Sequence, residues 1–117
     1  MGDKAYHKLL IWQKAHNLAL EVHKATRKFP KDEVFGLVSQ LRRASYSVAS
    51  NIVEGHARRS KKEFRQFLSI ARGSLAELEY YLELAKDVGY LGDEGYRDLE
   101  DRRAQAGYLL SKFVQSF

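Results

Sequence analysis

Five cationic side chains stand within eight consecutive positions, and this group has the clearest chemical potential in the chain. Its members are Arg58, Arg59, Lys61, Lys62 and Arg65. The group spans the predicted start of a helix, where free backbone N–H groups and the positive end of the helix dipole attract anions. The pattern predicts a phosphate-binding site that follows a nucleic-acid backbone, weakens with salt and reads little sequence. No aromatic platform for base stacking is expected beside it, because Phe64 and Phe67 belong to the predicted core.

Two further cationic groups precede this cluster. Arg42 and Arg43 lie in the middle of a predicted helix, where they could contact phosphates or pair with an acidic residue on a neighbouring helix. Lys24, Arg27 and Lys28 crowd the end of the first predicted helix. There they could bind an anion or interact with the negative end of the helix dipole. The sequence leaves both pairs of alternatives open.

The residues that enzymes use most do not form a recognisable site. The chain has four histidines and no cysteine, and its sequence contains no Glu-x-x-His motif. That motif marks di-iron helical bundles. His16 and His23 could share a helix face, but two histidines without nearby carboxylates are a weak metal pattern. P-loop, dinucleotide-binding and Ser-His-acid patterns are also missing from the sequence. We therefore expect no catalysis, no cofactor and no bound metal.

Charge is divided unevenly along the chain. Residues 1–72 have 15 Lys and Arg against 6 Asp and Glu, a net of +9, whereas residues 73–101 have 2 against 9, a net of −7. The whole chain has a net charge of +5. Such a division suggests one surface for polyanions and another for basic partners, contacts between copies, or simply solvated helix faces.

Length and composition indicate a single folded domain over residues 1–117, because 44% of the residues are hydrophobic and 30% are charged. The longest apolar run, residues 9–12, is far too short to span a membrane. The first four residues lack the apolar core of a secretory signal. Together with the absence of cysteine, these features predict a cytoplasmic protein with no membrane partner.

Four segments have apolar residues at helical spacing. The stripes run over residues 11–29, 34–52, 64–85 and 96–117. The members of the third stripe are Phe64, Phe67, Ala71, Leu75, Leu78, Leu82 and Ala85, without Leu68. The predicted helix boundaries are Pro30, Gly55, a capping box of Ser60 with Glu63, Gly89, and an Asp93 cap. Short loops between long helices make neighbours antiparallel, so we expect an all-α, up-down-up-down four-helix bundle.

Some residues do not fit a simple bundle core. The main stripes do not include the apolar residues Tyr46, Ile70, Tyr80, Tyr81 and Leu84. Self-association is one way in which these side chains could be buried. Polar residues lie on or near the inner side of the second helix, namely Gln40, Ser47, Asn51 and Glu54, and Arg72-Gly73-Ser74 interrupts the third helix. We favour a buried hydrogen-bond network for them over chemistry. Gly73, inside a helix, suggests close approach by another backbone.

The chain also resembles a known family, the bacterial four-helix-bundle proteins of 23S rRNA intervening sequences. The central matches are Phe29-Pro30-Lys31-Asp32-Glu33-Val34-Phe35-Gly36-Leu37, Gln40-Leu41-Arg42-Arg43-Ala44, Ser47 and Asn51-Ile52-Val53-Glu54-Gly55. The flanking matches are Trp12-Gln13-Lys14-Ala15, Phe67-Leu68, Ala71-Arg72-Gly73-Ser74-Leu75 and Glu77-Leu78-Glu79. The resemblance covers about residues 9–115 and departs at Val53, where the family usually has Ala.

This resemblance implies a cytoplasmic bundle that assembles into a homopentameric ring. The family includes the accessory variability determinant of diversity-generating retroelements, which binds nucleic acid and a reverse transcriptase, and many members without an assigned activity. Family positions that recur here are Arg42, Arg43, Asn51, Glu54, Arg72 and Ser74. The resemblance implies roles for them in fold or assembly more than in ligand contact.

Two functions of different classes follow. The first is a non-catalytic, oligomeric accessory protein that binds structured RNA or DNA through its basic surface beside an enzyme such as a reverse transcriptase. The second is a protein-interaction scaffold whose affinity for polyanions is incidental. Steep salt dependence without preference among nucleic acids would favour the scaffold.

Overall fold

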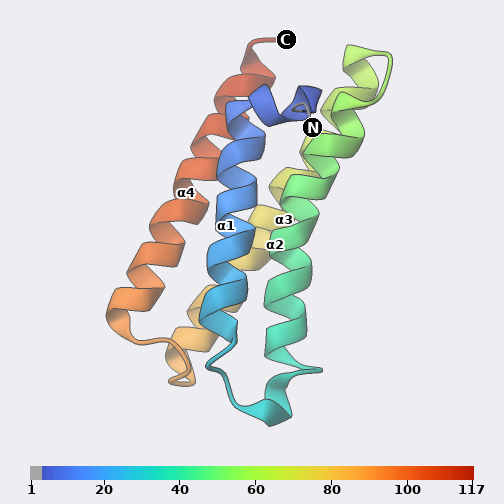
Figure 1. Ribbon diagram of the computed structural model, residues 1–117. Helices are drawn as coiled ribbons and strands as arrows, with labels where there is room; N and C mark the ends of the chain where they lie inside the picture. The colour runs from blue at the N-terminus through green and yellow to red at the C-terminus, as the bar shows by residue number, and fades with distance from the viewer. Residues whose placement is uncertain (1–3) are drawn as a thin grey trace.

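The computed structural model describes residues 4–117 and contains four long helices. They are α1 (Leu10–Thr26), α2 (Leu37–His56), α3 (Lys61–Asp87) and α4 (Asp93–Gln115) (Figure 1). Two short 3-10 helices, η1 (Ala5–Lys8) and η2 (Lys31–Glu33), precede α1 and α2. The described part of the chain has no strand, so the predicted all-α fold of four helices is confirmed.

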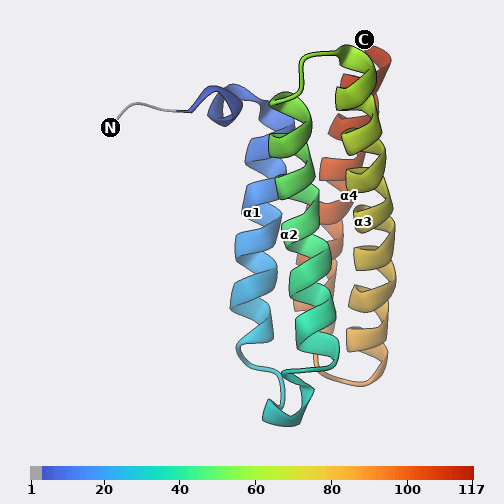
Figure 2. The same cartoon turned by 90° about the vertical axis from the view of Figure 1, so that its right-hand side faces the viewer.

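Each long helix packs against two others, α1 and α3 both lying against α2 and α4. Successive turns alternate between the two ends of the bundle (Figures 1 and 2). One end carries η1, the α2–α3 turn and the C-terminus, and the other carries the α1–α2 connection and the α3–α4 turn. Residues separated by 50 positions in sequence, such as η1 and the α2–α3 turn, therefore share one end of the molecule.

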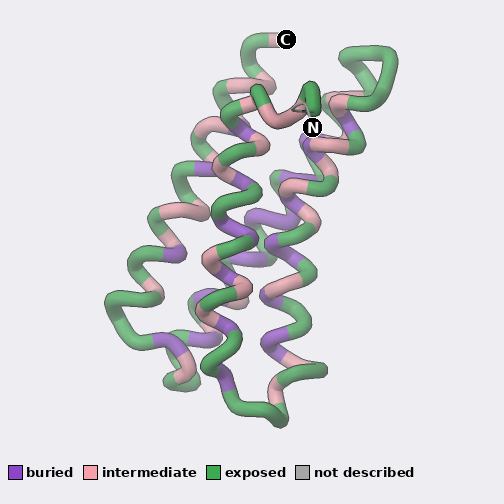
Figure 3. The backbone as a smooth tube through the Cα atoms, viewed as in Figure 1, coloured by how far each residue is buried: buried purple, intermediate pink, exposed green. Residues whose placement is uncertain are grey.

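The core follows the predicted stripes with one change in α3. Buried positions recur along all four helices (Figure 3), and the largest fully buried side chains are Leu18, Leu41, Ile52, Leu68, Leu78 and Leu82. The predicted stripe of α3 omitted Leu68 and included Phe64 and Phe67, which are only partly buried. These two rings lie in the first turns of α3, at the open end of the bundle, where burial is incomplete.

Local hydrogen bonds set both ends of α3 as predicted. Ser60 Oγ accepts the Glu63 N–H at 3.1 Å, which caps the helix start. The Glu63 carboxylate accepts from the Ser60 hydroxyl at 3.4 Å and not from the Ser60 backbone N–H, so the capping box is half formed. Gly89 has φ 88°, and the following N–H of Tyr90 reaches the Ala85 carbonyl at 2.9 Å, as in a Schellman motif.

The structure corrects two other helix boundaries. The second helix begins at Leu37 and not at residue 34, because η2 and the Gly36 N-cap precede it and leave Val34 and Phe35 outside the helix. Asp93 is the first residue of α4, and Gly92 occupies the predicted cap position of Asp93.

Another chain segment approaches Gly55 closely, and not Gly73 as predicted. Gly73 has no described atom within 4 Å of where a Cβ would lie, so that prediction is wrong. Gly55, predicted as a helix terminus, lies inside α2, and a Cβ there would be 2.8 Å from Phe67 Cβ and 2.8 Å from the Phe64 ring. The missing side chain of Gly55 thus lets the start of α3 pack against the end of α2.

A polar network does join α2 to α3. Ser47 Oγ and Ser74 Oγ lie 2.7 Å apart, and Asn51 Nδ2 donates to the Ser47 carbonyl at 2.8 Å and to its hydroxyl at 3.0 Å. Gln40 and Glu54, also expected near the inner side, are exposed. Gln40 instead accepts from Arg43 at the edge of the helix pair.

Candidate nucleic-acid interface

The α2–α3 turn presents the basic cluster at one end of the bundle (Figure 2). Its position is set from both sides: Gly55 allows Phe64 and Phe67 to pack against the last turn of α2, and Ser60 caps α3. The backbone that carries the cations is therefore held by packing and by a cap, although the turn itself is exposed.

Two members of the cluster are engaged by the scaffold. Arg58 lies 3.6 Å from a Glu54 carboxylate oxygen, and its guanidinium stands over the Phe67 ring at 4.7 Å. Arg65 donates to the Phe117 carbonyl at 3.2 Å, which joins α3 to the C-terminal residue. The charge of Arg58 is thus partly neutralised by Glu54, and the Arg65 guanidinium is held by a hydrogen bond to a backbone carbonyl.

The other three cations are uncommitted. Arg59, Lys61 and Lys62 are exposed, and within residues 4–117 none of their side chains forms a hydrogen bond or ion pair. Lys61 and Lys62 also belong to the first turn of α3, where backbone N–H groups have no acceptor within the helix. The cluster therefore offers three exposed positive charges, without a carboxylate partner among the described residues, next to the positive end of a helix dipole.

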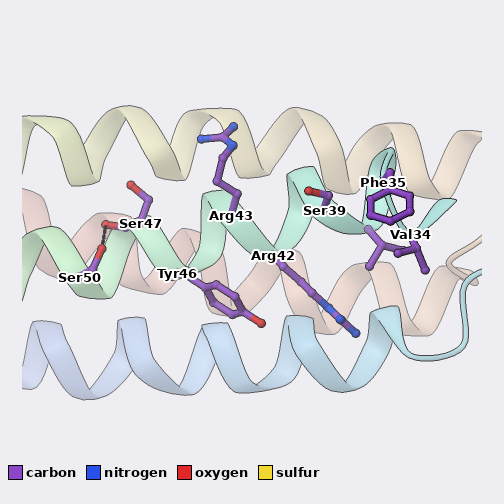
Figure 4. A pocket seen from close by; sticks show the side chains of 9 residues that line it. Val34, Phe35, Ser39, Arg42, Arg43, Tyr46, Ser47 and Ser50 are labelled. Atoms are coloured by element: carbon purple, nitrogen blue, oxygen red, sulfur yellow. Dashed lines mark hydrogen bonds between the residues drawn. The ribbon is translucent and has the colours of Figure 1, made fainter.

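Arg42 and Arg43 are separate from this cluster. Arg43 precedes Arg58 by 15 positions, which corresponds to roughly 20 Å along a helix. Figure 4 shows the two side chains diverging from α2, with Arg43 directed toward α3 and Arg42 toward α1. The structure does not unite the seven predicted cations in one surface.

Both of these arginines are bonded to neighbouring helices. Arg43 meets the Glu77 carboxylate of α3 at 2.7 Å, and this bond raises the pKa of Arg43 above its usual value. The alternative of pairing with an acidic residue is thus confirmed for Arg43. Arg42 Nε donates to Thr26 Oγ1 at 2.9 Å, and its NH2 group donates to the His23 carbonyl at 3.4 Å. Its charge thus lies at the C-terminal end of α1.

The outer face of α2 around these arginines carries a shallow hollow. A hollow of about 680 Å³ is bounded by Val34, Phe35, Arg42, Arg43 and Tyr46, with Ser39, Ser47 and Ser50 along it (Figure 4). The Phe35 side chain is exposed (95% for the residue). The Phe35 ring thus stands in solvent beside this hollow, where another molecule could contact it.

An aromatic column stands at the same end of the bundle as the basic cluster. The Trp12 ring lies between His7, 4.9 Å away, and His16, 4.8 Å away and nearly parallel at 9°. The i, i+4 spacing of Trp12 and His16 within α1 already places their rings on one helix face. Only the fold brings the start of α1 to the end of the bundle that carries the α2–α3 turn (Figures 1 and 2).

The two histidines considered as metal ligands are bound to aromatic residues. His16 stacks on Trp12, and His23 Nδ1 lies 2.8 Å from the Tyr46 hydroxyl. Burial, followed by the positive charges of Arg42 and Arg27, lowers the pKa of His23. Residues 4–117 contain no group of three or more His, Asp or Glu side chains placed to hold a metal ion.

Comparison with known proteins places this bundle in a family. The family described as 23S rRNA-intervening sequence protein matches residues 7–112. The chain belongs to this family. Its predicted family resemblance is thereby confirmed over nearly the whole chain.

A solved structure supports the fold independently. A protein of unknown function from the S23 ribosomal protein family of Bacteroides thetaiotaomicron is similar, with a TM-score of 0.81 and 24% sequence identity. The match covers 90% of this chain and 98% of that one. A comparison with curated proteins gave no significant match.

No helix within residues 4–117 has both the length and the apolar character needed to cross a membrane.

Proposed function

We propose that this 23S rRNA-intervening sequence family protein is a non-catalytic accessory protein that binds structured RNA or DNA through the α2–α3 turn. The observation that carries the proposal is the set of three uncommitted cations, Arg59, Lys61 and Lys62, at a capped helix start. Their charges gain most from phosphate, because no carboxylate within residues 4–117 pairs with them. Arg58 and Arg65 flank them and add electrostatic attraction.

The exposure of the whole turn, with cations spread over eight positions, favours contact with a nucleic-acid backbone over a small anion. Side chains of this kind fix position on phosphates and read little sequence. We therefore propose that specificity comes from an enzyme partner, such as a reverse transcriptase, in the cytoplasm. Arg42 and Arg43 have partners within the bundle, so in this proposal they are secondary contacts.

We also propose that copies of the chain associate, as a homopentameric ring. Support comes from large apolar side chains left in solvent on α3, where Ile70 is 52% and Tyr80 58% exposed. Association would bury them and would multiply the number of basic turns on one assembly. Light scattering that found a monomer at working concentration would contradict this part of the proposal.

Charge reversal tests the basic turn. The triple variant Arg59→Glu, Lys61→Glu and Lys62→Glu is compared with the parent in binding a structured RNA, a DNA duplex and an RNA–DNA hybrid at about 50 and 150 mM salt. The expected results are loss of binding and a salt dependence shallower by about one unit for each phosphate contact removed.

A matched control changes the same amount of charge at the other end of the bundle. Lys28→Glu, Lys31→Glu and Arg97→Glu reverse three exposed cations near the α1–α2 connection and the start of α4. This control is expected to retain most of the parental affinity. Equal affinity of the parent and the α2–α3 triple variant would overturn the site assignment, provided circular dichroism shows both folded.

A protein-interaction scaffold is the second candidate, and the exposed Phe35 ring beside the α2 hollow favours it. In that case, binding to all three nucleic acids disappears together at about 150 mM salt, with no preference among them. Phe35→Ala would then weaken capture of a protein partner while leaving the weak low-salt binding of nucleic acids unchanged.

A further inference from the structure

A groove between α1 and α2 begins at the basic end of the bundle. Its volume is about 460 Å³, and apolar surface predominates in it. The floor is made by small side chains such as Ala19 and Ala49, and rings stand along it. Volumes and linings of this kind are typical of sites for small, largely apolar ligands.

The rings are arranged at two levels of the groove. At one level, the His7–Trp12–His16 column ends on His16, an exposed residue that has no other ring contact among the described residues. At the other level, the centroids of the His23 and Tyr46 rings are 6.4 Å apart, their planes are inclined by 26°, and His23 Nδ1 lies 2.8 Å from the Tyr46 hydroxyl. His16 and His23 are seven residues apart on α1, roughly 10 Å. Leu20 lines the groove between these two levels, so a planar heteroaromatic ring bound there would pack on the Leu20 side chain with aromatic rings on either side of it.

Positive charge lies close to the mouth of the groove. Val53 lines the groove and precedes Arg58 by only five positions, and Lys8 of η1 is exposed at the same end. The groove itself contains no carboxylate. A ligand that combines a flat ring with a phosphate is therefore complementary to both parts, the groove and the basic turn.

We propose that the α1–α2 groove binds an unpaired nucleobase of a strand whose phosphates contact the α2–α3 turn. This inference rests on the proposed nucleic-acid function and adds that the recognised segment is single-stranded. Bases within a duplex are stacked on each other, so their faces cannot reach a groove on the protein surface. Base stacking on aromatic side chains is tolerant of sequence, which fits a site with few polar groups.

Trp12 is the only tryptophan in the chain and lines this groove, so its fluorescence reports on occupancy. The full-length protein is titrated with a single-stranded oligoadenylate of about 12 nucleotides and with an abasic strand of equal length. We expect the oligoadenylate to bind roughly tenfold more tightly and to quench Trp12 emission, because only it carries a base to stack. Equal affinities with unchanged emission would overturn the proposal.

Two variants remove exposed rings without emptying the core. His16→Ala and Tyr46→Ala are expected to weaken oligoadenylate binding roughly tenfold, with unchanged binding of the abasic strand and an unchanged salt slope. Tyr108→Ala, which removes an exposed tyrosine of α4 outside the groove, is the control and should match the parent. Parental binding by both groove variants would overturn the proposal. If Tyr46→Ala instead reduced the size of the assembly in light scattering, the groove would be an interface between copies, which also overturns it.

A mononucleotide separates this inference from the proposed function. If neither strand binds at any salt concentration, the proposed function fails, and adenosine monophosphate is titrated against Trp12 emission. Quenching that is lost in Tyr46→Ala would support a base site on its own. No quenching would overturn the base site as well.

Discussion

The hydroxyls of Ser47 and Ser74 meet at 2.7 Å between α2 and α3, and the Asn51 amide completes their hydrogen bonding from one turn further along α2. Ser74 is buried, so its hydroxyl has exchanged water for this partner. A buried polar bond of this kind specifies the register of two helices as well as contributing stability.

Ser74→Ala should lower the free energy of unfolding by about 1 kcal/mol, because it removes one net hydrogen bond and leaves Ser47 with Asn51 alone. Urea denaturation followed by circular dichroism measures the change. Ser69→Ala on the exposed side of α3 is the control, and it should be neutral or slightly stabilising. Equal effects of the two substitutions would contradict a stabilising role for the Ser47–Ser74 bond.

Two glycine substitutions should have opposite signs. Gly55→Ala places a methyl group 2.8 Å from Phe67 Cβ, so the α2–α3 junction must open at a cost of about 1–3 kcal/mol. Gly73→Ala meets no described atom within 4 Å and should stabilise α3 by about 1 kcal/mol through helix propensity. Thermal unfolding of both variants is the measurement. Destabilisation by Gly73→Ala would show an unrecognised contact at this exposed face.

The ion pairs of Arg103 and Arg43 should contribute unequally to the free energy of unfolding. The Arg103 side chain is only 13% exposed and lies 2.6 Å from Glu100 and 3.1 Å from Glu79, whereas the Arg43 side chain is 50% exposed. Arg103→Ala should cost about 2 kcal/mol, because it leaves a partly buried carboxylate without its donor. Arg43→Ala should cost less than about 1 kcal/mol, and this cost should shrink further in salt. Denaturant titrations at low and high salt compare the two, and equal losses would contradict this ranking.

The histidine on α1 beside Arg42 should make stability depend on pH. The pKa of His23 is lowered from 6.5 by burial first and then by the charges of Arg42 and Arg27. As the pH falls through about 6.5, His23 therefore becomes protonated in the unfolded chain while it is still neutral in the folded protein. The free energy of unfolding should fall as the pH drops through about 6.5, and the fall should end below the folded-state pKa.

Proton NMR of the His23 ring measures this pKa directly. Arg42→Ala should raise it, because one of the two positive charges is removed, and His23→Gln should reduce the loss of stability between about pH 7.5 and 5.5. An unchanged pH dependence in His23→Gln would assign the effect to other groups.

Much of the secondary structure was predictable, because its determinants are local. Ser60 and Gly89 act through bonds to residues three to five positions away, so their roles are visible in sequence. The start of α2 was missed because Val34 continues the apolar periodicity although η2 separates it from the helix. Leu68 was missed because Phe64 and Phe67 stand at equally good spacing, and only their position at the open end of the bundle leaves them partly exposed.

The sequence by itself determined the family, the four helices and the group of cations between α2 and α3. The partner of Arg58, Glu54, is only four residues away in sequence. Only the tertiary structure decided that Arg65 is bonded to Phe117, which comes from a distant element. It also decided that Gly55 and not Gly73 lies against a neighbouring chain segment, and that the Trp12 column opens a groove at the basic end. The physical reason is the same in each case. Helical periodicity defines a face, but the rotation and packing of each helix determine what that face meets.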